Sequence, residues 1–202
     1  MIPSRMAAGS ALVALWPGIG QAHAFKTGAA YPQFVEGAGA ALGEPAVLFS
    51  MVALGLLAAL WHSEGLVRLW PALLGGMLIG VVPAAVAGPS AVVAALAAGL
   101  VCAALAALGA RLPAGAMIPL AGLTGLATSL AMLAGHGFAE LPVSIYAGLL
   151  FGANLVLATA SSSAKLLLDR WSHPAIRLGL RIASSWIGAI AILLIAFSFR
   201  QI

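Results

Sequence analysis

The sequence contains very little charge. Only 7% of its 202 residues are Asp, Glu, Lys or Arg, whereas 63% are hydrophobic. A soluble domain carries roughly 25% charged residues, so this chain could not cover its own surface in water. Lipid removes that difficulty, because apolar side chains face it at no cost. The composition therefore predicts an integral membrane protein and excludes a soluble enzyme.

Cysteine is almost absent and the basic residues are dispersed. Cys102 is the only cysteine, which excludes an intrachain disulfide and a thiolate metal cluster; we interpret it as a small packed residue. The nine Lys and Arg residues form no basic run and no aromatic–basic pattern, so nothing indicates binding to nucleic acid.

The first 24 residues have the order of a secretory signal peptide. Arg5 gives a positive start, residues 6–15 are apolar, and Ala22 and Ala24 are small residues spaced as signal peptidase requires. The apolar stretch is shorter than the roughly 20 residues of a spanning helix. We expect cleavage after Ala24, the alternative being an uncleaved first helix.

Six later stretches are long and apolar enough to cross a bilayer. They cover residues 45–61 with a helical lead-in from Phe34, then 70–87, 90–110, 114–134, 143–168 and 176–199. Glycine and proline punctuate the breaks between them. The expected fold class is an all-α integral membrane protein, with a signal peptide in residues 1–24 and a bundle of six transmembrane helices in residues 25–202.

The basic residues predict an orientation. The loops after spans one, three and five, with the helix ends beside them, hold Arg68, Arg111, Lys165, Arg170, Arg177 and Arg181. The opposite side of the mature chain holds only Lys26 and Arg200. Loops rich in Lys and Arg stay in the cytoplasm. We therefore expect a protein of the inner (cytoplasmic) membrane with both mature termini on the periplasmic side.

Two further patterns concern helix packing and helix ends. Small residues four apart let helix backbones approach closely; Gly76 and Gly80 form one such pair in span two, and Gly148 and Gly152 form another in span five. Tryptophans collect at membrane interfaces. We expect four of them near helix ends: Trp61, Trp70, Trp171 and Trp186.

Three stretches carry a resemblance to a known family. Residues 34–57 (FVEGAGAALGEPAVLFSMVALGLL) contain an early glycine and end in a Met-x-Ala-x-Gly-Leu run. Residues 135–168 begin with a His-Gly segment followed by Glu140, and residues 181–197 form a small-residue helix after an arginine. Over most of its length the chain resembles the HupE/UreJ family of hydrogenase and urease accessory membrane proteins. The resemblance implies a signal peptide, six helices and permeation of nickel or cobalt.

The chain departs from this family at the metal motif. The family's first helix carries His-Pro-x-x-Gly-x-Asp-His, which is thought to hold the metal. Aligned on Met51, this chain has alanines at 40 and 41, Glu44 at the glycine, and Ala46 and Val47 at the Asp-His pair. Serines at 161–163 stand where the family's fifth helix often has a histidine.

His136, Glu140 and Glu44 are the candidate metal ligands. His136 and Glu140 lie four apart and would share a face of a continuous helix, and imidazole with carboxylate suits Ni²⁺, Co²⁺ or Zn²⁺. Gly137 and Pro142 favour instead a polar loop at the membrane surface. Glu44 is a functional candidate if it enters the bilayer, or a first-turn carboxylate stabilised by the helix dipole.

Asn154 and Ser161 are the candidate polar groups inside a span. They could contribute to an ion path or form interhelical hydrogen bonds. No histidine, aspartate or lysine lies near mid-membrane depth in a span to act as a base for catalysis, so we expect no enzyme.

Two functions stay open on the sequence. One is a HupE/UreJ-like permease for a divalent metal, with nickel or cobalt as the transported ion. The alternative is a non-transporting accessory or structural subunit that has lost the metal motif and contacts other membrane protein subunits as well as the lipid bilayer.

Overall fold

The structure is a computed structural model that describes residues 29–137, 139–171 and 173–199. Within them all regular structure is helical. The elements are α1 (Ala30–Gly43), α2 (Pro45–Trp61), α3 (Gly65–Val81), η2 (Pro83–Val86), α4 (Ser90–Leu108), α5 (Ala114–Leu133), α6 (Val143–Arg170) and α7 (Pro174–Ser198). The expected signal peptide and its cleavage after Ala24 lie outside the described residues.

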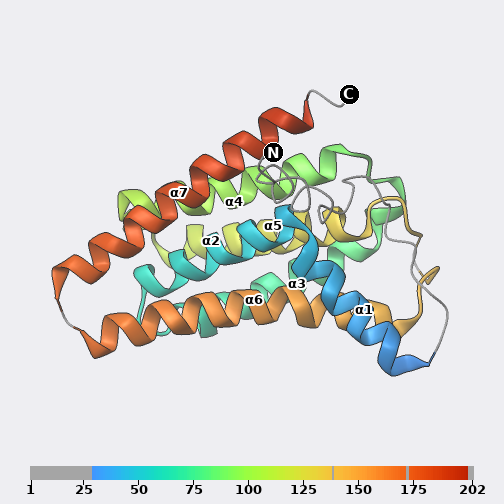
Figure 1. Ribbon diagram of the computed structural model, residues 1–202, viewed down its shortest axis with the longest axis horizontal. Coiled ribbons are helices and arrows are strands. Elements are labelled where there is room, and N and C mark those ends of the chain that lie inside the picture. Colours follow the sequence, from blue (N-terminus) through green and yellow to red (C-terminus); the bar gives the residue numbers. More distant parts are fainter. Residues whose placement is uncertain (1–28, 138, 172, 200–202) are drawn as a thin grey trace, which may run out of the picture.

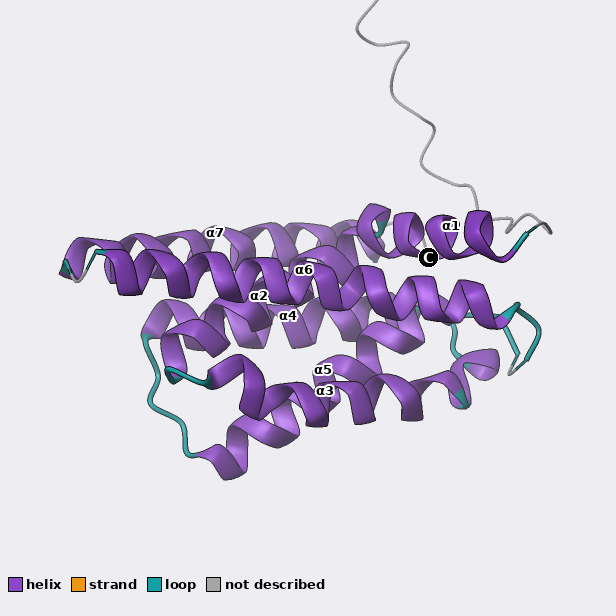
Figure 2. Cartoon of the chain, turned by 90° about the horizontal axis from the view of Figure 1, so that it is seen from below, coloured by secondary structure: helices purple, strands orange, loops and turns teal. Residues whose placement is uncertain are grey.

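The helices form three stacked layers (Figure 2). In that view α1, α6 and α7 make the upper layer, α2 and α4 the middle layer, and α3 and α5 the lower layer. The main pairings join α3 with α5, α1 with α6, α4 with α7, and α2 with both α4 and α6. The lower layer packs on the middle layer mainly through α5 against α4, so the middle layer is covered on both sides.

Helix α2 is the centre of the bundle. Its sequence is apolar on every face, which is the pattern of a helix surrounded by other helices. Met51, Leu54 and Leu57 are each at most 1% exposed and belong to the main core cluster. Around α2 the core is filled by side chains from α3, α4, α5 and α6.

A bend of 75° separates α1 from α2 (Figure 1). The sequence predicted one span with a helical lead-in, whereas the lead-in is a helix of its own that begins at Ala30. Pro45 causes the break, because proline lacks an N–H group and disfavours helical dihedrals in the residue before it. Glu44 is accordingly extended, with φ −86° and ψ 110°.

Both predicted glycine pairs lie at close helix crossings. A Cβ on Gly76 would lie 1.9 Å from the Gly122 carbonyl oxygen of α5, and one on Gly148 would lie 2.1 Å from the Phe34 carbonyl oxygen of α1. Gly80 and Gly152 are similarly tight against α5 and α1. The role predicted for these pairs is confirmed, and their partner helices are α5 and α1.

Four helices, α4 to α7, are long and apolar enough to cross a membrane, and the bent pair α1–α2 makes a fifth candidate. Helix α3 is apolar but has only 17 residues. It begins at Gly65 and ends at Val81, five residues earlier at its start and six earlier at its end than the sequence indicated, with Pro83 starting the separate turn η2. The predicted helical structure is confirmed. The sequence predicted six spans, whereas by length and composition four helices qualify, or five if the bent pair α1–α2 counts as one span.

Candidate functional site

His136 and Glu140 lie in the connection between α5 and α6, not on a continuous helix. Helix α5 ends at Leu133, and Gly135 then adopts a left-handed conformation with φ +81°. Glu140 is exposed and its Oε2 accepts a hydrogen bond from the Gly137 N–H at 2.5 Å. This segment is therefore a polar loop, which was the alternative to a shared helix face.

Glu44 lies at the bend between α1 and α2. It is half-buried, and its Oε1 accepts a long hydrogen bond of 3.4 Å from the Ala46 N–H in the first turn of α2. The described residues contain no group of three or more His, Cys, Asp or Glu side chains that could hold a metal ion. The structure thus does not bring Glu44, His136 and Glu140 together as a set of ligands.

Asn154 joins two helices inside the bundle. Its Oδ1 accepts a hydrogen bond of 2.6 Å from the Trp70 indole N–H of α3, and its Nδ2 donates to the Leu150 carbonyl at 2.8 Å. Trp70 therefore turns its polar edge into the protein. Of the two roles considered for Asn154, the observed contacts are those of interhelical hydrogen bonding.

Ser161 is 3% exposed on α6. It lines a small cavity of about 150 Å³ beside the connection between α2 and α3, together with His62 and Lys165. This position is near the Lys- and Arg-rich end of the bundle rather than beside His136 or Glu140.

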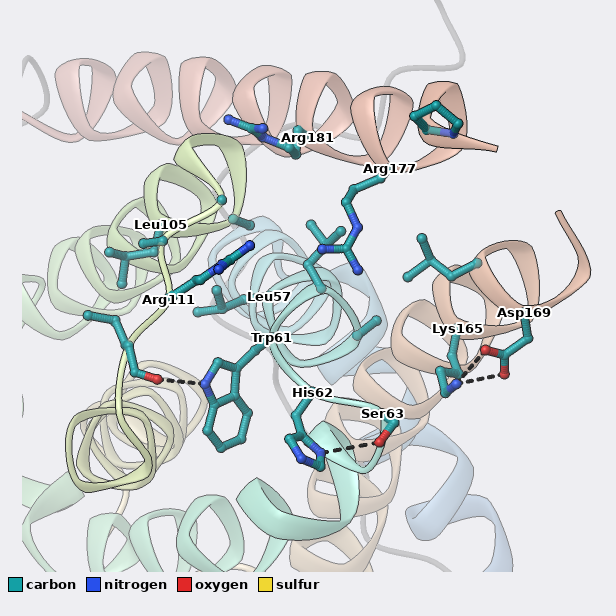
Figure 3. Close-up of a pocket in the computed structure, with 18 of the residues that line it drawn as sticks. Leu57, Trp61, His62, Ser63, Leu105, Arg111, Lys165, Asp169, Arg177 and Arg181 are labelled. Atoms are coloured by element: carbon teal, nitrogen blue, oxygen red, sulfur yellow. Dashed lines mark hydrogen bonds and ion pairs between the residues drawn. The ribbon is translucent and has the colours of Figure 1, made fainter. Parts of the chain in front are cut away.

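A larger cavity of about 910 Å³ opens at this end, which is the left end in Figure 1. We call it the cationic cavity. It lies where α2, α4 and α6 end and where α5 and α7 begin. Its charged lining residues are Arg111, Lys165, Asp169, Arg177 and Arg181 (Figure 3).

The charges of the cationic cavity are only partly balanced. Lys165 is paired with Asp169, with Nζ–Oδ distances of 2.5 and 2.7 Å. Arg181 donates to the carbonyl oxygens that end α4, at 2.7 Å to Ala107 and 2.9 Å to Leu108.

Two arginines of the cationic cavity have no such partner. The side chains of Arg111 and Arg177 make no hydrogen bond or ion pair with another described residue. Figure 3 shows both side chains extending into the space beside Leu57. The cavity therefore holds an excess of positive charge that its own residues do not neutralise.

The deeper wall of the cavity is apolar. Leu57, Leu105 and Leu112 line it together with the ring of Trp61. The Trp61 indole N–H donates to the Leu112 carbonyl at 2.8 Å, which fixes the ring at the end of α2 (Figure 3). A cationic mouth over an apolar wall can accept an anion that carries a hydrocarbon part.

Sequence reasoning missed this cavity. It treated the basic residues as an indicator of orientation and did not ask which of them meet. The signal was present, because every Lys and Arg in the described part of the chain lies in or beside the three connections at one end. Most of these basic residues line one cavity because the helices that carry them are neighbours, and the sequence alone does not reveal which helices pack together.

The fold and site define a helical protein whose apolar helices are compatible with membrane insertion and whose basic residues gather at one end. Comparisons with protein-family models, curated proteins and solved structures find no match to this chain. The resemblance to the HupE/UreJ family accordingly stays an expectation.

Proposed function

We propose that this chain is a non-transporting helical subunit of the inner membrane, built on a HupE/UreJ-like framework. The observation that carries the proposal is the filled core around α2, where Met51, Leu54 and Leu57 are at most 1% exposed. An ion path needs a polar interior at this place, whereas close apolar packing provides a rigid scaffold.

Most polar groups inside the helices support the same proposal, because hydrogen bonds within the bundle engage them. The buried Ser129 Oγ on α5 is an exception, since it has no hydrogen-bond partner among the described residues. Ser50 Oγ donates to the Ala95 carbonyl at 2.7 Å, and Thr124 and Thr128 donate to carbonyls of their own helix. With Asn154 bonded to Trp70, these side chains hold helices in place instead of facing an ion.

The proposal includes a topology of six crossings, with residues 1–24 removed and both mature termini on the periplasmic side. The bent pair α1–α2 counts as one crossing. The 17 residues of α3 lie at the short end of the range of about 17–25 residues that span a bilayer. Loops rich in Lys and Arg remain in the cytoplasm, which places the cationic cavity on that side.

Permeation of nickel or cobalt is the second candidate, and one observation favours it. Transporters often place their ion site at a break within a membrane helix, and the 75° bend between α1 and α2 carries Glu44. A site there would use Glu44 with backbone carbonyls near the break.

One experiment separates the two candidates. The protein is extracted gently from its native membrane, and its metal content and co-purifying chains are measured together. The subunit proposal expects a metal-free preparation with other chains in fixed ratio. Stoichiometric nickel or cobalt that is lost in Glu44→Gln, but kept in the exposed control Glu64→Gln at the other end, would contradict it and support permeation.

A further inference from the structure

We propose that the cationic cavity binds the phosphate group of an anionic membrane phospholipid, with Arg111 and Arg177 as the phosphate-binding residues. This inference concerns an end of the bundle that the subunit proposal does not use. It requires that the helices lie in a membrane, and it holds for either function considered above.

The first argument is the unbalanced charge. Among the described residues, Asp169 is the only carboxylate that lines the cavity, and it is paired with Lys165, while Arg181 bonds to the carbonyls that end α4. Two guanidinium groups without partners among the described residues then line one space. Both arginines are exposed, so an anion can reach them, and its charge would balance positive charge that otherwise only water screens.

The second argument is the geometry of the donors. A guanidinium group presents a planar fork of N–H donors that matches two phosphate oxygens at once. Arg111 comes from the connection between α4 and α5, whereas Arg177 comes from the first turn of α7. Donors from two separate elements can hold a phosphate from two directions (Figure 3).

The third argument favours a lipid over a soluble phosphate. The volume of about 910 Å³ is near the upper end of the roughly 300–1,000 Å³ that encloses drug-sized ligands, and it is far larger than a phosphate ion requires. Leu57, Leu105 and Leu112 provide an apolar wall suited to the glycerol and upper acyl carbons. Basic pockets between membrane helices are a common site for anionic head groups.

The test compares lipid retention by matched variants. Detergent-solubilised protein is exposed to equal amounts of phosphatidylglycerol and phosphatidylcholine, and the retained lipid is counted by native mass spectrometry. Wild type should retain phosphatidylglycerol preferentially. Arg111→Gln with Arg177→Gln should reduce that preference about tenfold or more, because each basic residue contributes substantially to anionic lipid binding.

The matched control removes the same charge from the same end. Arg68 pairs with Glu64, and neither Arg68 nor Arg170 lines the cationic cavity. The double variant Arg68→Gln with Arg170→Gln should keep the preference of wild type. An equal loss in both double variants would show nonspecific surface attraction and overturn the proposed site.

Two further measurements make the result decisive. Arg111→Lys with Arg177→Lys keeps the charge and should retain more of the preference than the glutamine pair; thermal unfolding checks that each variant is folded. Pyrophosphate is titrated into lipid-free protein as the soluble source of phosphate. Tight pyrophosphate binding that requires both arginines, without any lipid preference, would overturn the lipid assignment.

Discussion

At the scale of single residues, hydrogen-bonding side chains inside the bundle connect elements that are distant in sequence. The bond from Trp70 to Asn154 links α3 to α6, and the bond from Ser50 to the Ala95 carbonyl links α2 to α4. In lipid, a polar group without a hydrogen-bond partner in the protein cannot bond to water instead. Such bonds fix which helices face each other, although each contributes modestly to stability.

The Trp70–Asn154 bond gives a prediction at this scale. Asn154→Leu keeps a similar side-chain size but removes the acceptor, and we expect it to lower the free energy of unfolding by about 1 kcal/mol. Reversible unfolding in mixed detergent–SDS micelles measures the change.

Thr159→Val is the control for Asn154→Leu. Thr159 lies on the same helix but bonds only to the Leu155 and Val156 carbonyls of its own preceding turn, so its replacement should change stability little. If the Asn154 and Thr159 variants unfold alike, the link between α3 and α6 contributes nothing to stability.

At the scale of elements, glycines set the distance between paired helices. Two neighbours in α3 differ sharply: a Cβ on Gly76 would meet the backbone of α5, whereas one on Gly75 would have nothing within 4 Å. Backbone atoms cannot move aside as a flexible side chain can. The pairs α3–α5 and α1–α6 therefore tolerate no side chain at their crossings.

These two glycines provide a matched pair of substitutions. Gly76→Ala should lower the free energy of unfolding by about 1–3 kcal/mol, the range of an overpacked core. Gly75→Ala should leave it unchanged or raise it slightly, because alanine favours a helix more than glycine does. Unfolding in the same micelles measures both, and a Gly76→Ala protein as stable as wild type would disagree with the α3–α5 crossing described above.

Tryptophan placement shows how the elements refine the sequence pattern. Trp61 and Trp171 lie at helix ends as expected, and Trp70 is within the first turns of α3. The expectation is wrong for Trp186, which is halfway along α7 and 71% exposed. Helix α7 is also the least covered candidate span, with 17% of its most apolar window buried, so this tryptophan lies on an outer face.

At the scale of the whole molecule, the proposed topology puts the two ends of the bundle on opposite sides of the membrane. In a Cys102→Ala background, a cysteine at Ser63 marks the end with the cationic cavity, and a cysteine at Ala85 marks the turn η2. Both positions are exposed. A membrane-impermeant maleimide added to cells with a permeable outer membrane should label Ala85→Cys and not Ser63→Cys.

Labelling after lysis is the control for access and should reach both cysteines. The opposite pattern in intact cells would invert the orientation, and labelling of both positions on the same side would contradict a crossing by α3.

The sequence by itself determined that the described chain is helical, where α4 to α7 run, and that its basic residues fall in alternate loops. These features are local: a helix satisfies its own backbone groups, prolines and glycines interrupt it where they occur, and charge is excluded from apolar segments. The role of the Gly76–Gly80 and Gly148–Gly152 pairs could be predicted as well, because their spacing is also a local feature of the sequence.

Only the tertiary structure decided which helices are neighbours. The sequence did not predict that the other helices surround α2 or that Asn154 bonds to Trp70. It also did not predict that His136 and Glu140 follow a left-handed Gly135 and therefore share no helix face. It could not bring Arg111 and Arg177, 66 positions apart in the chain, into one cavity. Such contacts depend on how the helices pack against one another, and apolar helices have no local signal for the choice of partner.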